Sequence, residues 1–232
     1  EGIKIMSEIL INKVDYIEQT QESPEARPSS AAVALQLGAL AMQFARVERV
    51  PRYEDGERES DAEHSFMLGL VAPELSYRLY PSSLNHALIA QYALVHDLIE
   101  VKTGDVSTFN IDDASLKDKE AAEKQVLHEL LRELPPLTRS LLQSYEQQDS
   151  KEARFVRAVD KLLPIVVDIF GQGERVLRED HNVHSLQHLS ECQLTLRERM
   201  HRRFSEFPQV IRDHELLSDL FADELSATGQ LQ

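Results

Sequence analysis

The chain has little cysteine, no tryptophan, and far fewer basic than acidic residues. Cys192 is the single cysteine among 232 residues, so no disulfide can form within the chain. We therefore expect a protein of a reducing compartment, the cytoplasm. Lysine and arginine number 25 against 40 aspartate and glutamate residues, a formal net charge of −15. Nucleic-acid polymers are not expected as partners, because their binding requires clustered basic residues. A small anionic substrate remains compatible, because a metal ion and a few local cations can reverse the field in a pocket.

Long apolar runs and targeting signals are also scarce. The longest run, AAVALQLGALAMQFA over residues 31–45, contains two glutamines. It is shorter than a membrane span, so it predicts a buried helix. We recognise no secretory signal sequence and expect no association with a membrane.

Helix is the main structure that the sequence predicts. Glycine numbers only 8, and alternating β-branched stretches are nearly absent. We divide the chain into an N-terminal helix and linker, residues 1–30, and an all-α domain with additional C-terminal helices, residues 31–232. Two prolines within residues 22–30 mark the linker, and the polar segment 46–59 is interpreted as a loop. Helices are expected over residues 5–21, 31–45, 61–80, 84–101, 114–133, 136–147, 151–178, 184–204 and 209–227. Six apolar side chains predict one buried stripe on the helix over 151–178: Val156, Val159, Leu163, Val166, Val167 and Phe170.

The dipeptide His96-Asp97 carries the strongest chemical signal. It lies inside the apolar stretch QYALVHDLIE, where a charged side chain is costly unless it is paired or bound to a metal. His64, which a capping-box pattern places in the first turn of a helix, and Asp160, on a later apolar helix, can join it. Glu100 lies one helical turn after the dipeptide. Two histidines and two aspartates suit a divalent transition ion. The pattern therefore predicts metal-assisted hydrolysis inside a helical bundle.

The order of these residues resembles the HD-domain metal-dependent phosphohydrolases. Over roughly residues 31–170 the chain is similar to the 5′-deoxynucleotidase-like branch of that superfamily. The motifs that carry the resemblance are Arg49-Val-Pro-Arg52, Glu63-His64-Ser65, His96-Asp97-Leu-Ile-Glu100, Thr103-Gly104-Asp105 and Asp160. The resemblance implies an HD-domain helical bundle that binds one divalent metal ion and hydrolyses a phosphate ester.

The resemblance also implies a role for each matched residue. The implied ligands of one divalent ion (Mn, Co, Fe, Ni or Zn) are His64, His96, Asp97 and Asp160. Glu100 and Asp105 are the implied catalytic carboxylates, which orient the attacking water or handle protons. Arg49, with Arg52 as its substitute, is the implied contact to the substrate phosphate, because a guanidinium matches a phosphate dianion well.

One position departs from the family pattern. Bacterial nucleotidases of this branch have a tryptophan directly after the arginine that matches Arg49, and it helps to position the nucleotide. Val50 stands there in this chain, which has no tryptophan. Tyr53 and Phe109 are the candidates to pack against a base instead.

We therefore predict a cytoplasmic phosphomonoesterase that acts on (deoxy)nucleoside 5′-monophosphates, and we expect a homodimer. Two alternatives stay open: hydrolysis of a nucleoside triphosphate or a phosphodiester, and a non-catalytic dimeric module stabilised by its metal. A rival zinc site is offered by His181, His184 and His188, although their polar surroundings favour a solvated surface. Asp168 is a rival to Asp160 with a poorer match to the pattern.

Overall fold

The computed structural model describes residues 10–11, 13–14, 29–109, 111 and 113–231. Most of the expected helix over 5–21, all but residues 10–11 and 13–14, and most of the expected linker over 22–30 lie outside these residues, so the division of the chain at residue 30 stays a prediction. In chain order the elements are α2 (Ser30–Phe44), β1 (Glu48–Arg52), β2 (Arg58–Ser60), α3 (Asp61–Leu79), α4 (His86–Val95), α5 (Glu100–Thr103), α6 (Asp113–Glu133), α7 (Pro136–Gln147), α8 (Lys151–Asp160), α9 (Leu163–Phe170), α10 (Gly173–Glu179), α11 (Leu186–Arg203) and α12 (Pro208–Ala227). The all-α class is confirmed, with one small sheet added.

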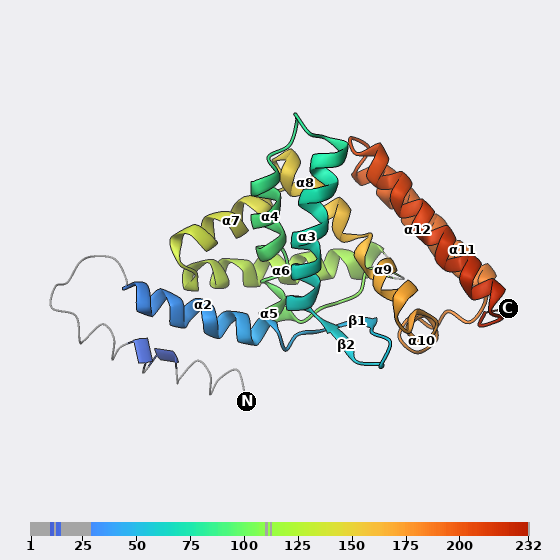
Figure 1. Cartoon of the computed structure of the whole chain (residues 1–232). Coiled ribbons are helices and arrows are strands. Elements are labelled where there is room, and N and C mark those ends of the chain that lie inside the picture. Colours follow the sequence, from blue (N-terminus) through green and yellow to red (C-terminus); the bar gives the residue numbers. More distant parts are fainter. Residues whose placement is uncertain (1–9, 12, 15–28, 110, 112, 232) are drawn as a thin grey trace.

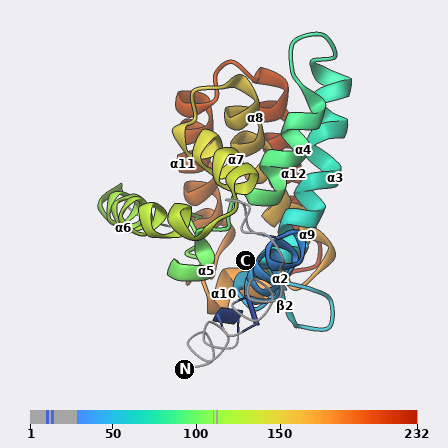
Figure 2. The same ribbon diagram turned by 90° about the vertical axis from the view of Figure 1, so that its left-hand side faces the viewer.

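The main core lies where α3, α4 and α8 pack together (Figure 1). Phe155, Leu68 and Ile89, one from each of these helices, are fully buried there. The helices α11 and α12 form an antiparallel pair along one side, and α9 lies between this pair and the rest. The view in Figure 2 shows α6 extending away from the other helices. Within the part of the chain that the structure describes, no helix combines the length and hydropathy needed to cross a bilayer.

The capping box predicted at the start of α3 is confirmed. The Ser60 side chain accepts a hydrogen bond from the backbone N–H of Glu63, and the Glu63 carboxylate accepts one from the backbone N–H of Ser60. This pair satisfies two N–H groups that the first helical turn would otherwise leave unpaired. It fixes the helix start, and with it the position of His64 in the first turn.

Two helices predicted as continuous are interrupted, and both interruptions lie at proposed metal ligands. The helix predicted over 84–101 ends at Val95, and α5 begins only at Glu100. The residues between them form a turn with 3₁₀-type hydrogen bonds, in which a backbone N–H donates to the carbonyl three residues earlier. One example is the bond from the Glu100 N–H to the Asp97 carbonyl. The predicted helix over 151–178 is three helices, of which the first ends at Asp160. Pro164 explains that end, because a proline ring clashes with the carbonyl four residues earlier, here that of Asp160.

The predicted stripe along residues 156–170 is mostly buried, although the helix that carries it is interrupted. Val156 and Val159 on α8 and Leu163 and Val167 on α9 are all buried. The exception is Phe170, at the end of α9, which is 80% exposed.

The segment 46–59, interpreted as a loop, contains an antiparallel hairpin in which Glu48 pairs with Ser60 and Arg52 with Arg58. The end of β1 lies against the junction of α9 and α10, where the backbone N–H of Gln172 donates a hydrogen bond to the Arg52 carbonyl. A Cβ atom on Gly171 would lie 1.9 Å from that carbonyl oxygen. Glycine is therefore required here by the close approach of two backbones.

Candidate metal centre and catalytic site

Four side chains from the ends of three helices converge on one point. His64 lies in the first turn of α3, His96 and Asp97 follow the last residue of α4, and Asp160 is the last residue of α8. Each offers a ligand atom, and the four atoms all lie within 4.8 Å of one another. The structure therefore brings together all four side chains that the resemblance implied as ligands, which is the arrangement that a single cation requires.

The two imidazoles are oriented with one nitrogen toward this point. His96 Nδ1 lies 2.8 Å from the Ala93 carbonyl oxygen, which can only accept, so Nδ1 carries the hydrogen. His96 Nε2 is then the nitrogen that faces the carboxylates, 2.9 Å from Asp97 Oδ2, and the one available to a metal ion when its proton is released. In His64 the Nε2 atom faces Asp160 Oδ1 at 2.8 Å, and Nδ1 faces the Glu59 carboxylate at 3.5 Å. A ligating histidine typically gives its second nitrogen to a carbonyl or carboxylate in this way, so the donor set fits a divalent transition ion.

The electrostatics of the cluster also favour a bound cation. Burial acts to lower the pKa of His96, but the charge of Asp97 and the bond to Asp160 raise it to about 10. Burial acts to raise the pKa of Asp97, yet the neighbouring His96 charge holds it below its usual range. The carboxylates thus stay ionised and attract a positive charge. Protons and a metal ion compete for the same imidazole nitrogens, so metal binding here releases protons.

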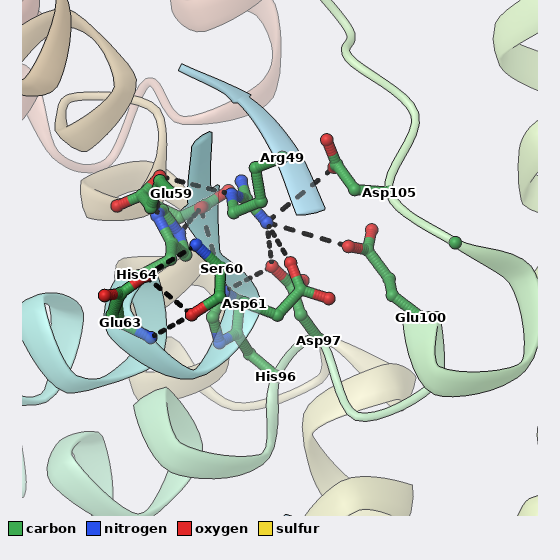
Figure 3. A network of polar contacts seen from close by, with 12 residues as sticks. Arg49, Glu59, Ser60, Asp61, Glu63, His64, His96, Asp97, Glu100 and Asp105 are labelled. Carbon is green, nitrogen blue, oxygen red and sulfur yellow. Dashed lines mark hydrogen bonds and ion pairs between the residues drawn. The ribbon is translucent and has the colours of Figure 1, made fainter. Parts of the chain in front are cut away.

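Arg49, on β1, lies in the centre of a group of carboxylates (Figure 3). Its Nη1 atom is 3.0 Å from Asp61 and 2.9 Å from Asp97, and it lies 3.6 Å from Glu100 and 3.7 Å from Asp105. Burial acts to lower the pKa of Arg49, but nearby carboxylates, chiefly Asp97, Asp105 and Asp160, raise it well above its ordinary value. The guanidinium therefore stays charged and holds the acidic groups around the candidate metal site together.

Glu100 and Asp105 reach the site from α5 and from the segment that follows it. Both carboxylates face Arg49 Nη1, and both line the cavity next to the metal cluster. Arg52 contacts Asp180 at 3.4 Å and Glu179 at 3.7 Å instead. The implied catalytic and phosphate-binding roles of these residues stay predictions, and the geometry favours Arg49 over Arg52 as the arginine at the site.

Two buried carboxylates at the site were not anticipated from the sequence. Glu59 is fully buried, with its carboxylate 3.4 Å from Arg49 Nε and 3.5 Å from His64 Nδ1. Asp61 is equally buried. Burial and the nearby Asp97 charge raise its pKa to about 6, although Arg49 acts to lower it. Glu59 lies in the polar segment interpreted as a loop, and Asp61 is the first residue of the predicted helix over 61–80, so only their long-range partners mark them as site residues.

A cavity of about 220 Å³ adjoins the cluster. Of the two aromatic candidates for a base contact, Phe109 lines this cavity, whereas Tyr53 lines a separate groove beside the hairpin. His181 also lines the cavity, with its ring centroid 4.8 Å from that of Phe109. Among the described residues, the groups of three or more potential ligands that lie close enough to share an ion do not include the three rival histidines or Asp168.

Comparisons with known proteins agree with this geometry. A family model described as the HD domain matches residues 43–200. The human protein named 5′-deoxynucleotidase HDDC2 is 29% identical over 149 residues, which cover 59% of this chain and 70% of the human protein. The protein named 5′-deoxynucleotidase hdd1 from Schizosaccharomyces pombe is 27% identical over 145 residues, which cover 57% of this chain and 70% of the yeast protein. A crystal structure described as a "Predicted metal-dependent phosphohydrolase" from Magnetospirillum magnetotacticum has the same fold, with a TM-score of 0.60 and 23% identity, over 88% of this chain and 98% of that one.

Proposed function

The chain belongs to the HD domain family of metal-dependent phosphohydrolases, and on that premise we propose that it removes phosphate from (deoxy)nucleoside 5′-monophosphates. The observation that carries the proposal is the convergence of two imidazoles and two carboxylates within 4.8 Å, next to a cavity of small-molecule size. The relatives named 5′-deoxynucleotidases support the choice of substrate.

We propose that His64, His96, Asp97 and Asp160 hold one divalent ion, with Mn, Fe, Co, Ni and Zn as candidates. Such an ion supplies a lowered pKa for coordinated water and polarises a phosphoryl oxygen. The remaining steps belong to the residues of the chain.

Arg49 and the two carboxylates that face it have complementary proposed roles. The Arg49 guanidinium borders both the metal cluster and the cavity, so it is placed to hold a phosphate dianion. Glu100 and Asp105 reach the same point from another segment. We assign them proton transfer and orientation of the attacking water, because a carboxylate beside the reacting group can accept and return a proton.

The test begins with protein stripped of metal by a chelator. Elemental analysis and phosphate release from a panel of nucleotides are then measured on the same preparation after addition of Mn²⁺, Co²⁺ or Zn²⁺. Metal-dependent release from a monophosphate is expected, and no release from any nucleotide contradicts the proposal. Glu100→Ala is expected to retain metal and fold but lose turnover, whereas Glu57→Ala, at an exposed position of the hairpin turn, leaves turnover intact. An unchanged rate in Glu100→Ala would contradict the catalytic role of Glu100, whereas metal binding without any turnover in the wild type would favour the non-catalytic metal-stabilised module.

Hydrolysis of a triphosphate or a diester is the second candidate. Lys161, Arg199 and Arg203 line the cavity in addition to Arg49, which offers more positive charge than the sequence suggested for a longer phosphate chain. Lys161 lies 2.8 Å from Asp160, and Arg199 donates to the Ile111 carbonyl, so both are already engaged within the protein. The products decide: inorganic phosphate indicates a monoesterase, tripolyphosphate a triphosphohydrolase, and a released monoester a diesterase.

We also propose a homodimer in the cytoplasm. Large apolar side chains are exposed on neighbouring helices, Phe66, Leu70 and Tyr77 on α3 and Leu94 on α4, and an exposed apolar patch often marks an interface. The single cysteine supports a reducing compartment. Light scattering of the wild type and Phe66→Glu tests the dimer: a lower mass for the variant supports it, and a monomeric wild type contradicts it.

A further inference from the structure

Among the described residues, two groups of side chains have ligand atoms close enough to share a cation, and both groups include Asp97. The first group is the proposed metal centre. The second group consists of Asp61, Asp97 and Glu100, whose ligand atoms also lie within 4.8 Å of one another. Asp61 is the first residue of α3 and Glu100 the first residue of α5. Hydrolases with two metal ions hold them about 3.5–4 Å apart, so two adjacent groups that share one carboxylate have the outline of a two-ion site.

The second group already surrounds a positive charge, the guanidinium of Arg49. Its Nη1 atom lies 3.0 Å from Asp61 Oδ1, 2.9 Å from Asp97 Oδ2 and 3.6 Å from Glu100 Oε2. Figure 3 shows these three carboxylates turned toward this one nitrogen. A divalent ion would lie about 2.0–2.2 Å from the same oxygens, in the space that Nη1 fills. The ion and the guanidinium therefore exclude each other at this position.

The Asp61 carboxylate keeps one oxygen that the protein does not use. Its Oδ1 atom accepts from Arg49, but its Oδ2 atom is buried and has no hydrogen-bond partner among the described residues. The whole residue is 0% exposed. A buried carboxylate oxygen without a partner is unfavourable, so this oxygen is available to coordinate a cation if the guanidinium is removed.

The charge around Arg49 would also attract a replacement cation. Besides the second group, Glu59 and Asp105 form ion pairs with Arg49, at 3.4 Å and 3.7 Å. Loss of the arginine would leave these buried carboxylates uncompensated, which is strongly unfavourable. A divalent ion would restore the missing positive charge at the same place.

We propose that Arg49 takes the place of a second divalent ion and is the residue that limits this site to one. The inference rests on the proposed metal centre of the phosphomonoesterase and deepens it. In two-ion hydrolases both ions stabilise oxygens of the reacting group. Here a guanidinium that is part of the chain supplies the second positive centre, beside Asp97 and at the wall of the cavity. This charge is present at any metal concentration, so the site requires only one ion.

The experiment counts the Mn²⁺ ions bound by the wild type, Arg49→Ala and Arg49→Lys, using equilibrium dialysis and elemental analysis at saturating Mn²⁺. The wild type is expected to bind about one ion per chain and Arg49→Ala about two, because alanine opens both the space and the charge of the second group. Arg49→Lys keeps a positive charge and is expected to bind about one.

Electron paramagnetic resonance of the same samples distinguishes a paired site from ions scattered over the acidic surface. Two Mn²⁺ ions about 3.5–4 Å apart are magnetically coupled, whereas isolated ions are not. A coupled signal is expected in Arg49→Ala and is expected to disappear when Asp61→Asn is added, since Asp61 belongs to the second group alone. Arg46→Ala, at an exposed position, is the matched control and is expected to behave as the wild type.

A coupled pair of ions in the wild type or in Arg49→Lys overturns the inference, and so does a single ion in folded Arg49→Ala. If circular dichroism shows that Arg49→Ala is unfolded without metal, Mn²⁺ is expected to fold it with the coupled pair bound, and a chain that stays unfolded in Mn²⁺ overturns the inference as well. These outcomes do not depend on turnover and leave the phosphomonoesterase proposal standing. A wild type that binds no Mn²⁺, Co²⁺ or Zn²⁺ refutes the proposed metal centre, and the proposed function with it.

Discussion

Replacement of Arg49 by methionine tests the electrostatic design of the site most directly. The Arg49 guanidinium lies 2.9 Å from Asp97 and 3.0 Å from Asp61, and both the arginine and Asp61 are buried. At an effective dielectric constant of about 20, one such pair at about 3 Å interacts by about 5 kcal/mol. Desolvation offsets part of this value, and breaking a buried pair typically costs about 3–5 kcal/mol because the partner charge is left uncompensated.

We therefore expect Arg49→Met to lower the free energy of unfolding of the metal-free protein by about 3–5 kcal/mol at neutral pH. Urea unfolding followed by far-ultraviolet circular dichroism measures this value, since the chain has no tryptophan for fluorescence. The loss should shrink when a divalent ion is added, because a bound cation supplies positive charge to the same carboxylates.

Arg46→Met is the matched control. Arg46 lies three residues earlier and is exposed, so its replacement should change stability by no more than about 0.5 kcal/mol. Equal, small effects of the two substitutions would refute the reasoning, because they would mean that the carboxylates around Arg49 do not depend on its charge.

Three further predictions concern other parts of the molecule. Glu59→Gln should weaken divalent-ion affinity by about 10–100-fold, because it removes the carboxylate behind a ligating imidazole; calorimetry against the exposed Glu57→Gln measures it, and equal affinities would contradict the assignment. Burial raises the pKa of Asp168 from 3.8 to about 8. The protonated side chain therefore favours the folded state fully below about pH 4, and this contribution to the free energy of unfolding declines as the pH rises to about 8. The stability of Asp168→Asn relative to the wild type should therefore rise across that interval by up to about 1.4 kcal/mol per pH unit, and a difference that is constant with pH in urea unfolding would count against the burial. Phe155→Ala should cost about 3–5 kcal/mol in the same assay, whereas Phe170→Ala, 80% exposed, should cost little; comparable losses would contradict the core described above.

The metal cluster was predictable from the sequence, because its residues carry their own chemical signal. A His-Asp dipeptide inside an apolar stretch requires a partner, and the ordered set of His64, His96, Asp97 and Asp160 matched a family pattern. The helix around the dipeptide was predicted less well. Its turn after Val95 has helical backbone angles at His96, so local sequence does not distinguish the turn from a continuing helix.

The other differences between the predicted and the observed structure have two causes. Some sequence signals were outweighed by stronger ones, and some residues depend on partners far away in the chain. Pro164 marked the end of α8, but the apolar periodicity on either side of it favoured one long helix. The hairpin was missed because the two buried positions of β1 are Arg49 and Pro51, a charged residue and a proline, so the usual alternation of apolar and polar strand residues does not appear. Glu59 resembled a surface residue for the same reason: only the tertiary fold supplies the arginine and histidine that make its burial possible.

The close approach at Gly171 has a consequence for how sequence changes in this protein are read. The position lies in a connection between two short helices and has no chemistry of its own. Any side chain there would displace the Arg52 carbonyl, and Arg52 shares its short strand with Arg49. A change at Gly171 is therefore expected to be transmitted along three residues of backbone to Arg49 and the carboxylates around it, so a variant at this position should be read as a change to the candidate metal site rather than as a neutral change in a loop.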